Sequence, residues 1–375
     1  MSEQEIYEKF IKWMDTPIME LTESESMMTM ITSWITPEEA EFLTGFPWGS
    51  KTLEELAELK NIHPAELAPK LKELCDKGLI YESIRGDSRR YRLLDVGQMF
   101  LRMPFWAGKD DDEALKKMAH YANQYYMDGW KDQDKPVRHN ALRSLPINKT
   151  IEDKKQILPF EDVLQVVDNF EYFTVSHCPC RERHRLDPDY KDSSHPSEVC
   201  LHFDELGRYC VEHGMGREIT KEETLEILKK AADSGLVHGL TNWEENPDTI
   251  CNCDPTYCTV FRPFHHLGHD RSMDPSNYLV KVSSPETCKA CGLCVKRCPM
   301  DALQLKVSAQ ATNKFFKVVE VNTDLCIGCG VCVHKCPTQS IILERREEIT
   351  KPFKDVREYM KSMLADKQAA KEKQA

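Results

Sequence analysis

Two runs of sequence, CKACGLCVKRCP at residues 288–299 and CIGCGVCVHKCP at residues 326–337, decide how this chain is interpreted. Each run holds four cysteines in the spacing C-x-x-C-x-x-C-x-x-x-C and ends in a proline. The runs match at one constant offset, which also pairs Gly292 with Gly330. The region is therefore an internal duplication.

The spacing of these cysteines suits an iron-sulfur cube. Three closely spaced thiolates surround three irons, while the fourth cysteine points away to a second cluster. A glycine beside the second cysteine lets the backbone bend tightly enough to aim N–H groups at sulfide. A pair of zinc sites is the alternative, since C-x-x-C is also a zinc spacing. Eight cysteines in two matching runs, each with its proline, are more specific than a zinc ribbon and favour two clusters.

The repeat resembles bacterial-type ferredoxins that carry two [4Fe-4S] clusters. The resemblance implies one cluster on Cys288, Cys291, Cys294 and Cys336, and the other on Cys326, Cys329, Cys332 and Cys298. Between the two runs the chain departs from the shortest ferredoxins, where LQLKVSAQATNKFFKVVEVN predicts an enlarged hairpin over residues 303–322. Such a hairpin would screen one cluster from water or form a docking edge.

Six further cysteines form two triplets upstream of the repeat. They are Cys178, Cys180 and Cys200, and Cys251, Cys253 and Cys258. With the landmarks SHCPCR, VCL, GREIT, GLVH and ICNC, they resemble the upstream module of a group of 4Fe-4S dicluster proteins from strict anaerobes. Many of those carry CNCC-x-CCC where this chain has CNCDPTYC, so the resemblance leaves the ligand set open.

For these triplets we expect a third [4Fe-4S] cluster, with a fourth cluster left open. The thiolates that bind the third cluster would come from both triplets, with Arg181 nearby to offset the cluster charge. Structural zinc and free buried thiols are the alternatives. His265, His266 and His269 follow the second triplet. A ligand role is open to them, although histidines in such positions are more often structural.

Cys75 and Cys210 lie outside both groups, in stretches with helical periodicity. A cysteine at such a position is expected to act as a small buried hydrophobe.

The composition of the chain limits its domain number, its partners and its cellular location. The chain has 375 residues, of which 41% are hydrophobic and 30% charged, enough for two to four domains with their own cores. Its net charge of -12 repels phosphate backbones, so a nucleic-acid partner is not expected. No secretory signal pattern starts at Met1 and no apolar stretch could span a bilayer, so we expect a cytoplasmic protein. Sixteen cysteines in that setting indicate metal binding rather than disulfides.

The region from about 35 to 97 predicts two helices and a hairpin. Thr52 followed by Glu55 forms a capping box for the first helix, and Pro64 opens the second. The segment LIYESIRGDSRRYRLLD, residues 79–95, alternates in polarity on both sides of a turn. This order of elements resembles a winged helix-turn-helix domain.

We therefore expect an α+β multidomain chain. The expected segments are a winged-helix-like domain at 1–105, a helical linker at 106–156, a cysteine-bearing α+β module at 157–277, a ferredoxin-like dicluster domain at 278–345 and a charged C-terminal helix at 346–375.

Function follows from the clusters. Two clusters on a ferredoxin repeat allow one-electron hops but provide no substrate site, and the sequence shows no dinucleotide or phosphate-binding fingerprint. We expect an electron-transfer protein, more a non-catalytic oxidoreductase subunit than an enzyme, that relays single low-potential electrons in an anaerobic system. Its partners would be a flavoprotein, a ferredoxin or an oxidoreductase subunit. The acidic surface favours partners with basic docking patches.

Two other classes stay open. One is an iron-sulfur redox sensor that regulates transcription through the winged helix, whose second helix and hairpin carry Lys70, Lys72, Arg85, Arg89, Arg90 and Arg92. Glu66 and Glu73 on the same helix weigh against it. The other is a reductase with catalysis at an incompletely ligated upstream cluster.

Overall fold

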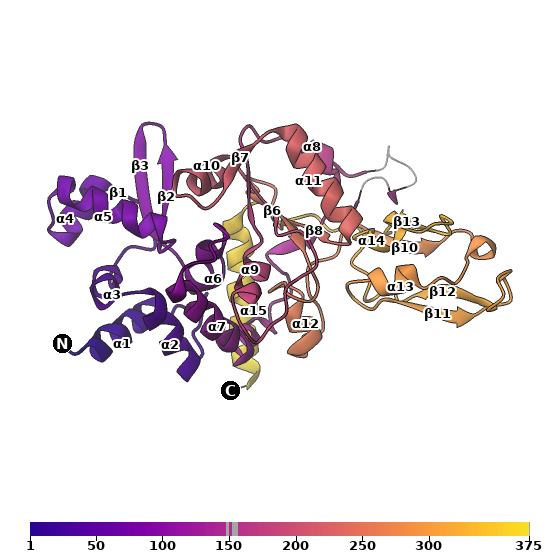
Figure 1. Ribbon diagram of the computed structural model, residues 1–375, viewed down its shortest axis with the longest axis horizontal. Helices are drawn as coiled ribbons and strands as arrows, with labels where there is room; N and C mark the ends of the chain where they lie inside the picture. The colour runs from indigo at the N-terminus through magenta and orange to yellow at the C-terminus, as the bar shows by residue number, and fades with distance from the viewer. Residues whose placement is uncertain (148–149, 152–156, 375) are drawn as a thin grey trace. The chain divides into compact units, whose positions relative to one another are not determined.

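The computed structural model describes residues 1–147, 150–151 and 157–374 (Figure 1). It divides into two compact units, each built from separate stretches of chain. Unit 1 consists of Met1–Pro136, Tyr172–Ile219 and Leu364–Ala375, and unit 2 consists of Val137–Glu171 and Thr220–Met363. Both units contain helices and strands, in agreement with the expected α+β class. The expected middle module, 157–277, contributes to both units, and the domain bounds stay predictions.

The first 136 residues of unit 1 are mainly helical. The helices are α1 (Glu3–Met14), α2 (Glu25–Trp34), α3 (Pro37–Leu43), α4 (Leu53–Lys60), α5 (Pro64–Asp76), α6 (Val96–Leu101), η1 (Met103–Phe105), α7 (Glu113–Met127) and η2 (Trp130–Asp134). Their apolar faces enclose a core that includes Phe10, Met30, Phe46 and Tyr125. Burial of these large side chains provides the main driving force for this part of the fold.

Local signals start the helices α4 and α5. The Thr52 hydroxyl accepts a hydrogen bond from the Glu55 amide at 3.2 Å, and the Glu55 carboxylate accepts one from the Thr52 amide at 2.8 Å. This is the expected capping box, and Pro64 is the first residue of α5 as expected.

A small antiparallel sheet accompanies these helices. Its strands β1 (Lys51–Thr52), β2 (Ile80–Arg85) and β3 (Ser88–Leu93) lie in the order β1-β3-β2. The predicted hairpin is therefore confirmed. The winged-helix interpretation of these elements stays a prediction.

The rest of unit 1 surrounds the first cysteine triplet. It comprises β5 (Phe173–His177), α9 (Pro179–Arg185), β6 (Glu198–Phe203), α10 (Asp204–Glu212) and β7 (Arg217–Ile219). Strand β5 pairs antiparallel with both β6 and β7.

Unit 2 has its own antiparallel strands β4 (Leu142–Ser144), β8 (Val237–Thr241) and β9 (Thr249–Cys253). Its helices before the cysteine runs are η5 (Pro159–Glu161), α8 (Val163–Asp168), α11 (Lys221–Ser234) and α12 (Arg262–His266). Thr220 caps α11 at its start, and Gly235, with φ of 98°, ends it.

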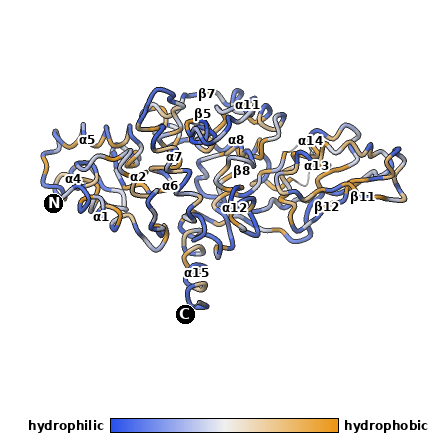
Figure 2. Tube along the Cα trace, turned by 60° about the horizontal axis from the view of Figure 1, so that its bottom comes forward, coloured by the Kyte–Doolittle hydropathy of each residue, from blue (hydrophilic) through white to orange (hydrophobic). Residues whose placement is uncertain are grey.

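The duplicated region occupies the C-terminal part of unit 2. Its elements are β10 (Tyr278–Val282), η6 (Pro285–Thr287), α13 (Leu293–Arg297), β11 (Leu303–Val307), β12 (Lys317–Val321), α14 (Val331–His334) and β13 (Ile341–Arg345). Strand β10 pairs with β13, and β11 pairs with β12, both antiparallel. The enlarged hairpin is therefore confirmed as β11–β12 (Figure 1), and apolar and hydrophilic segments both occur along it (Figure 2).

The charged segment at the end of the chain forms α15 (Val356–Gln374), the helix expected there. Tyr359 and Met363 on it are buried. Within unit 1, Lys367 donates hydrogen bonds to the Ile18 carbonyl at 2.9 Å and to the Gln133 side chain at 3.0 Å. None of the described helices is long and apolar enough to span a membrane.

Candidate metal centres

The first cavity of the duplicated region is lined by four cysteines, one of which comes from the second run. They are Cys288, Cys291, Cys294 and Cys336, around about 330 Å³ of space. Apolar side chains of Leu293, Leu305, Val319 and Ile341 complete the lining. The structure thus brings together the four thiols that the resemblance assigns to one cluster.

The second cavity has the reciprocal composition. Cys326, Cys329 and Cys332 of the second run and Cys298 of the first surround about 290 Å³ of space. Val280, Met300 and Leu303 lie on its walls. Four sulfur donors in an otherwise apolar lining fit an iron-sulfur cluster, because its irons take thiolate ligands and oxygen donors are not needed.

The backbone conformation repeats along with the cysteines. Helix α13 follows Gly292 with φ of 73°, and α14 follows Gly330 with φ of 77°, both in the left-handed region that favours glycine. This turn directs backbone amides toward sulfur. Amides of Val295 and Val331 hydrogen-bond to the thiols of Cys294 and Cys329. Such N–H···S bonds tune the potential of a bound cluster.

Without a cluster, four of these thiols are harder to ionise than a free cysteine. Burial raises the pKa of Cys294 to about 11 and raises the pKa values of Cys298, Cys329 and Cys332. Burial also acts to raise the pKa of Cys336, but hydrogen bonds from Ser340 and Thr338 outweigh it and lower the pKa. Because a cluster binds thiolates, its insertion releases protons.

The two cavities differ in how far their cysteines are enclosed. Cys291 in the first cavity is exposed, whereas Cys326, Cys329 and Cys332 in the second are 8%, 6% and 4% exposed. The carbonyl of Cys329 accepts a hydrogen bond from the Ile147 amide at 3.2 Å. The second loop is therefore fastened to the body of unit 2.

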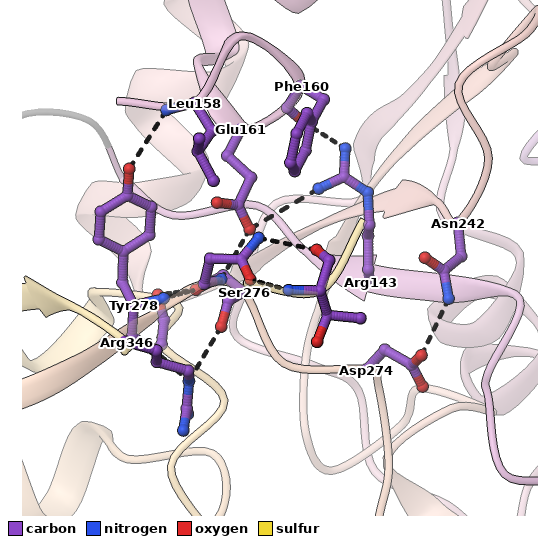
Figure 3. A network of polar contacts seen from close by, with 12 residues as sticks. Arg143, Leu158, Phe160, Glu161, Asn242, Asp274, Ser276, Tyr278 and Arg346 are labelled. Carbon is purple, nitrogen blue, oxygen red and sulfur yellow. Dashed lines mark hydrogen bonds and ion pairs between the residues drawn. The ribbon is translucent and has the colours of Figure 1, made fainter. Parts of the chain in front are cut away.

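A buried polar network continues this fastening (Figure 3). Ser276 donates from its hydroxyl to the Gly328 carbonyl at 3.0 Å. Arg346 donates to the carbonyls of Ser276 and Tyr278, each at 3.1 Å, and to the Cys326 carbonyl. No sequence pattern marks Ser276 or Arg346, since their role arises only from tertiary contacts.

A buried ion pair between Glu161 and Arg143 is also drawn in Figure 3. The Glu161 carboxylate accepts a hydrogen bond from the Asn277 amide at 2.8 Å and lies 3.8 Å from the Arg143 guanidinium. Burial raises the pKa of Glu161 and lowers the pKa of Arg143 to about 10. Removal of either partner would leave a buried charge uncompensated.

A cation, Arg297, lies near two cysteines of the second cavity, Cys329 and Cys332. Arg297 donates to the Val331 carbonyl at 3.2 Å and to the Ala232 carbonyl at 3.0 Å. Burial lowers its pKa, while the nearby Cys332, Asp233 and Cys329 act to raise it. Its counterpart in the second run, Lys335, forms an ion pair with Asp233 at 2.6 Å instead.

The upstream cysteines are gathered within their own units. In unit 1, Cys178 hydrogen-bonds to Cys180, which with burial raises the pKa of Cys178, and nearby Arg181 acts to lower it. Cys200 lies on β6, where it pairs with Ser176.

In unit 2, Cys253 hydrogen-bonds to both Cys251 and Cys258, and these bonds and burial raise its pKa. The second triplet thus has its three thiols in contact, and the first has a contact between Cys178 and Cys180. The joint cluster expected from both triplets stays a prediction. His265 interacts with the Pro299 carbonyl at 2.9 Å, which fits a structural role.

Comparison with known proteins covers part of the chain. No curated protein and no solved structure matched it. Residues 287–340 match a family described as the 4Fe-4S dicluster domain. The matched segment contains both cysteine runs of the duplication and neither upstream triplet, and it supports an iron-sulfur electron-transfer role for this part of the protein.

Proposed function

We propose that this protein relays single low-potential electrons between redox partner proteins through two [4Fe-4S] clusters. The proposed ligands are Cys288, Cys291, Cys294 and Cys336 for the first cluster, and Cys298, Cys326, Cys329 and Cys332 for the second. One observation carries the proposal: within a segment that matches a dicluster family, each set of four thiols surrounds one cavity.

The two cavities would have different positions in the relay. Cys291 is exposed, so a cluster in the first cavity can exchange electrons with a partner at the surface. Three of the four proposed ligands of the second cluster, Cys326, Cys329 and Cys332, are buried, and Arg297 lies near it. A cation near a cluster stabilises its reduced, more negative form. Electrons would therefore enter or leave through the first cluster.

The partner would dock beside the first cavity, on the β11–β12 hairpin. Val307, Phe315 and Phe316 on this hairpin are 77%, 54% and 67% exposed. The hairpin lies next to the first loop, because the Asn313 side chain donates to the Cys288 carbonyl at 2.9 Å. Exposed aromatic side chains of this kind often mark interaction sites.

The charge of this surface indicates the partner's chemistry. Lys289, Lys314 and Lys317 are exposed, and none has a carboxylate partner among the residues the structure describes. The surface is therefore locally basic on a chain with a net charge of -12. This favours an electron carrier with an acidic face, opposite to the partner that the net charge suggests.

The upstream triplets would hold a third [4Fe-4S] cluster, with zinc as the alternative occupant. Support comes from the thiol contacts of Cys178 with Cys180 and of Cys253 with Cys251 and Cys258, and from the burial of most of these thiols. Iron and sulfide counts on anaerobically purified protein test this. Roughly twelve irons per chain are expected for three clusters, and roughly eight would contradict the third.

The regulator alternative has less support, because ion pairs neutralise several of its cations. Arg89 pairs with Glu82 and Glu212, and Lys72 pairs with Asp76. Paired arginines and lysines offer little charge to DNA phosphates. Arg85 is also among the cations expected to contact DNA, but its side chain is not among those that the structure describes. A relay protein should bind random duplex DNA weakly at any salt concentration.

The relay is tested by removing one ligand from each proposed cluster. Cys291→Ala combined with Cys329→Ala should abolish rapid reduction by dithionite, followed by anaerobic stopped-flow absorbance. Cys210→Ala is the matched control, since Cys210 is a buried cysteine of α10 outside both cavities. Reduction of the double variant at the rate of the control would refute the relay.

A further inference from the structure

A group of potential metal ligands lies in unit 1, away from both cysteine runs and both upstream triplets. Cys75 in α5, Glu82 in β2 and His213 after α10 each place one ligand atom within 4.8 Å of the other two. All three residues are buried, and Cys75 is fully so. Residues distant in sequence thus bring a thiol, a carboxylate and an imidazole to one point.

His213 provides the second, independent observation. Its Nδ1 hydrogen-bonds to Asp76 Oδ1 at 2.6 Å, and its Nε2 is buried with no hydrogen-bond partner among the residues that the structure describes. Only 2% of its side chain is exposed. A buried polar atom without a partner is rare in native proteins, and an ion at the site is one of its recognised explanations.

The contact with Asp76 is the one that a metal-binding histidine usually makes. Such a histidine donates its other ring N–H to a carboxylate, which fixes the ring orientation and raises the basicity of the free nitrogen. Asp76 is itself held by Lys72 at 2.6 Å. The imidazole is therefore oriented with Nε2 as its available ligand atom.

The donor set indicates the metal. Thiolate, imidazole and carboxylate together suit Zn²⁺, whereas Ca²⁺ and Mg²⁺ take oxygen ligands. Ligands of tetrahedral zinc lie about 3.5 Å apart for bonds of about 2.0 to 2.3 Å, so the distances between the three ligand atoms would shorten by about 1 Å at most. Arg89 and Tyr91 also bond to Glu82, but a carboxylate offers about four acceptor positions and one stays available for a metal.

We infer that Cys75, Glu82 and His213 form a zinc site with water in the fourth position. Zinc binding displaces the thiol proton of Cys75. The ion joins the end of α5 and strand β2 to the end of α10. The site is independent of the proposed electron relay.

Tyr209 in α10 already links the same elements, since its hydroxyl donates to the carbonyls of Cys75 and Ile80 at 3.0 and 2.9 Å. The zinc ion would strengthen this junction. Cys75 would then be a ligand rather than the simple buried hydrophobe expected from the sequence.

The test measures zinc and iron in the full-length, cluster-loaded protein after incubation with zinc chloride and removal of loosely bound metal. The expected result is one tightly bound zinc per chain, with a loss of tenfold or more in zinc affinity for His213→Gln and Cys75→Ala. The iron content should not change. Cys210→Ala, which removes an equally buried thiol of α10, should keep its zinc.

X-ray absorption at the zinc edge separates this site from zinc in the upstream triplets, and it needs no variant to fold. One sulfur and three nitrogen or oxygen ligands are expected here, whereas a site in the triplets would show three or four sulfurs. Absence of tightly bound zinc, a sulfur-only zinc shell, or unchanged zinc affinity in folded His213→Gln would each overturn the inference.

Discussion

The loop that starts at Cys288 and the loop that starts at Cys326 have matching cysteine spacings but different surroundings. The first loop leaves Cys291 exposed and lies beside the β11–β12 hairpin. The second is enclosed, with carbonyls held by Ile147, Ser276 and Arg346. A duplicated ligand pattern therefore defines what can bind, while the surrounding residues define how each site can be used.

One position shows the difference within the loops themselves. Ala290 and Gly328 occupy equivalent places, with φ of 51° and 67°. Ala290 shows that alanine can adopt this backbone in the first loop. A Cβ on Gly328 would overlap the Ser276 hydroxyl and the Tyr278 carbonyl oxygen. Glycine is required in the second loop by the close approach of the body of unit 2.

The largest expected effect follows from this overlap. Gly328→Ala should destabilise the second loop by about 3 to 5 kcal/mol, because the backbone of Tyr278 cannot move away freely. About half of the iron in the duplicated region should be lost, as measured by iron content and by EPR of the reduced protein.

Two variants of the first loop are the controls for Gly328→Ala. Ala290→Gly should lower the stability of the first loop by less than about 1 kcal/mol. Gly292→Ala should cost about 1 to 2 kcal/mol, since its Cβ would meet nothing within 4 Å and only the left-handed backbone is strained. Equal iron loss in Gly328→Ala and Gly292→Ala would contradict the difference in enclosure.

A smaller effect is expected at the docking surface. Phe316→Ser combined with Lys314→Glu should slow reduction by an acidic [2Fe-2S] ferredoxin by about tenfold and weaken its salt dependence. Reduction by titanium(III) citrate should not change, because that reagent needs no docking surface. Stopped-flow absorbance measures both rates.

The matched control is Met360→Ser with Lys361→Glu, which changes one exposed apolar residue and one exposed lysine on α15. It should leave both rates unchanged. Equal slowing in control and hairpin variants would remove the hairpin as the docking site. If titanium(III) citrate did not reduce the unmodified protein, the relay itself would be contradicted.

The smallest expected effect concerns the cation at the second cavity. Arg297→Gln should lower the reduction potential of the second cluster, because a positive charge near the thiolates stabilises the reduced state. The first cluster should keep its potential. A redox titration monitored by EPR separates the reduction potentials of the two clusters.

Lys335→Gln serves as the control, since Lys335 is paired with Asp233. It should shift neither potential as far as Arg297→Gln does. If both variants shifted the second cluster equally, the electrostatic role of Arg297 would be wrong.

The sequence predicted local features well. The capping box at Thr52, the start of α5 at Pro64 and the β11–β12 hairpin depend on neighbouring residues, and the structure contains all three. The grouping of the cysteines came from the resemblance to two-cluster ferredoxins, and in the structure the same sets of four thiols surround the two cavities. Their role as ligands stays a prediction.

Features that depend on distant segments could not be predicted. The contacts of Ser276 and Arg346 with the second loop have no sequence pattern, because they join residues far apart in the chain. The same holds for His213 beside Cys75. The local charge of the proposed docking surface could not be predicted either, because net charge averages over the whole chain while a partner would meet only a local patch.

The central claim is that the two sets of four cysteines hold two [4Fe-4S] clusters close enough to exchange electrons. EPR of the anaerobically purified, fully reduced protein tests it most directly. The account predicts signals from two reduced clusters that broaden each other through spin coupling, with Cys329→Ala leaving one narrow signal. A reduced protein without such signals and without acid-labile sulfide would contradict the claim.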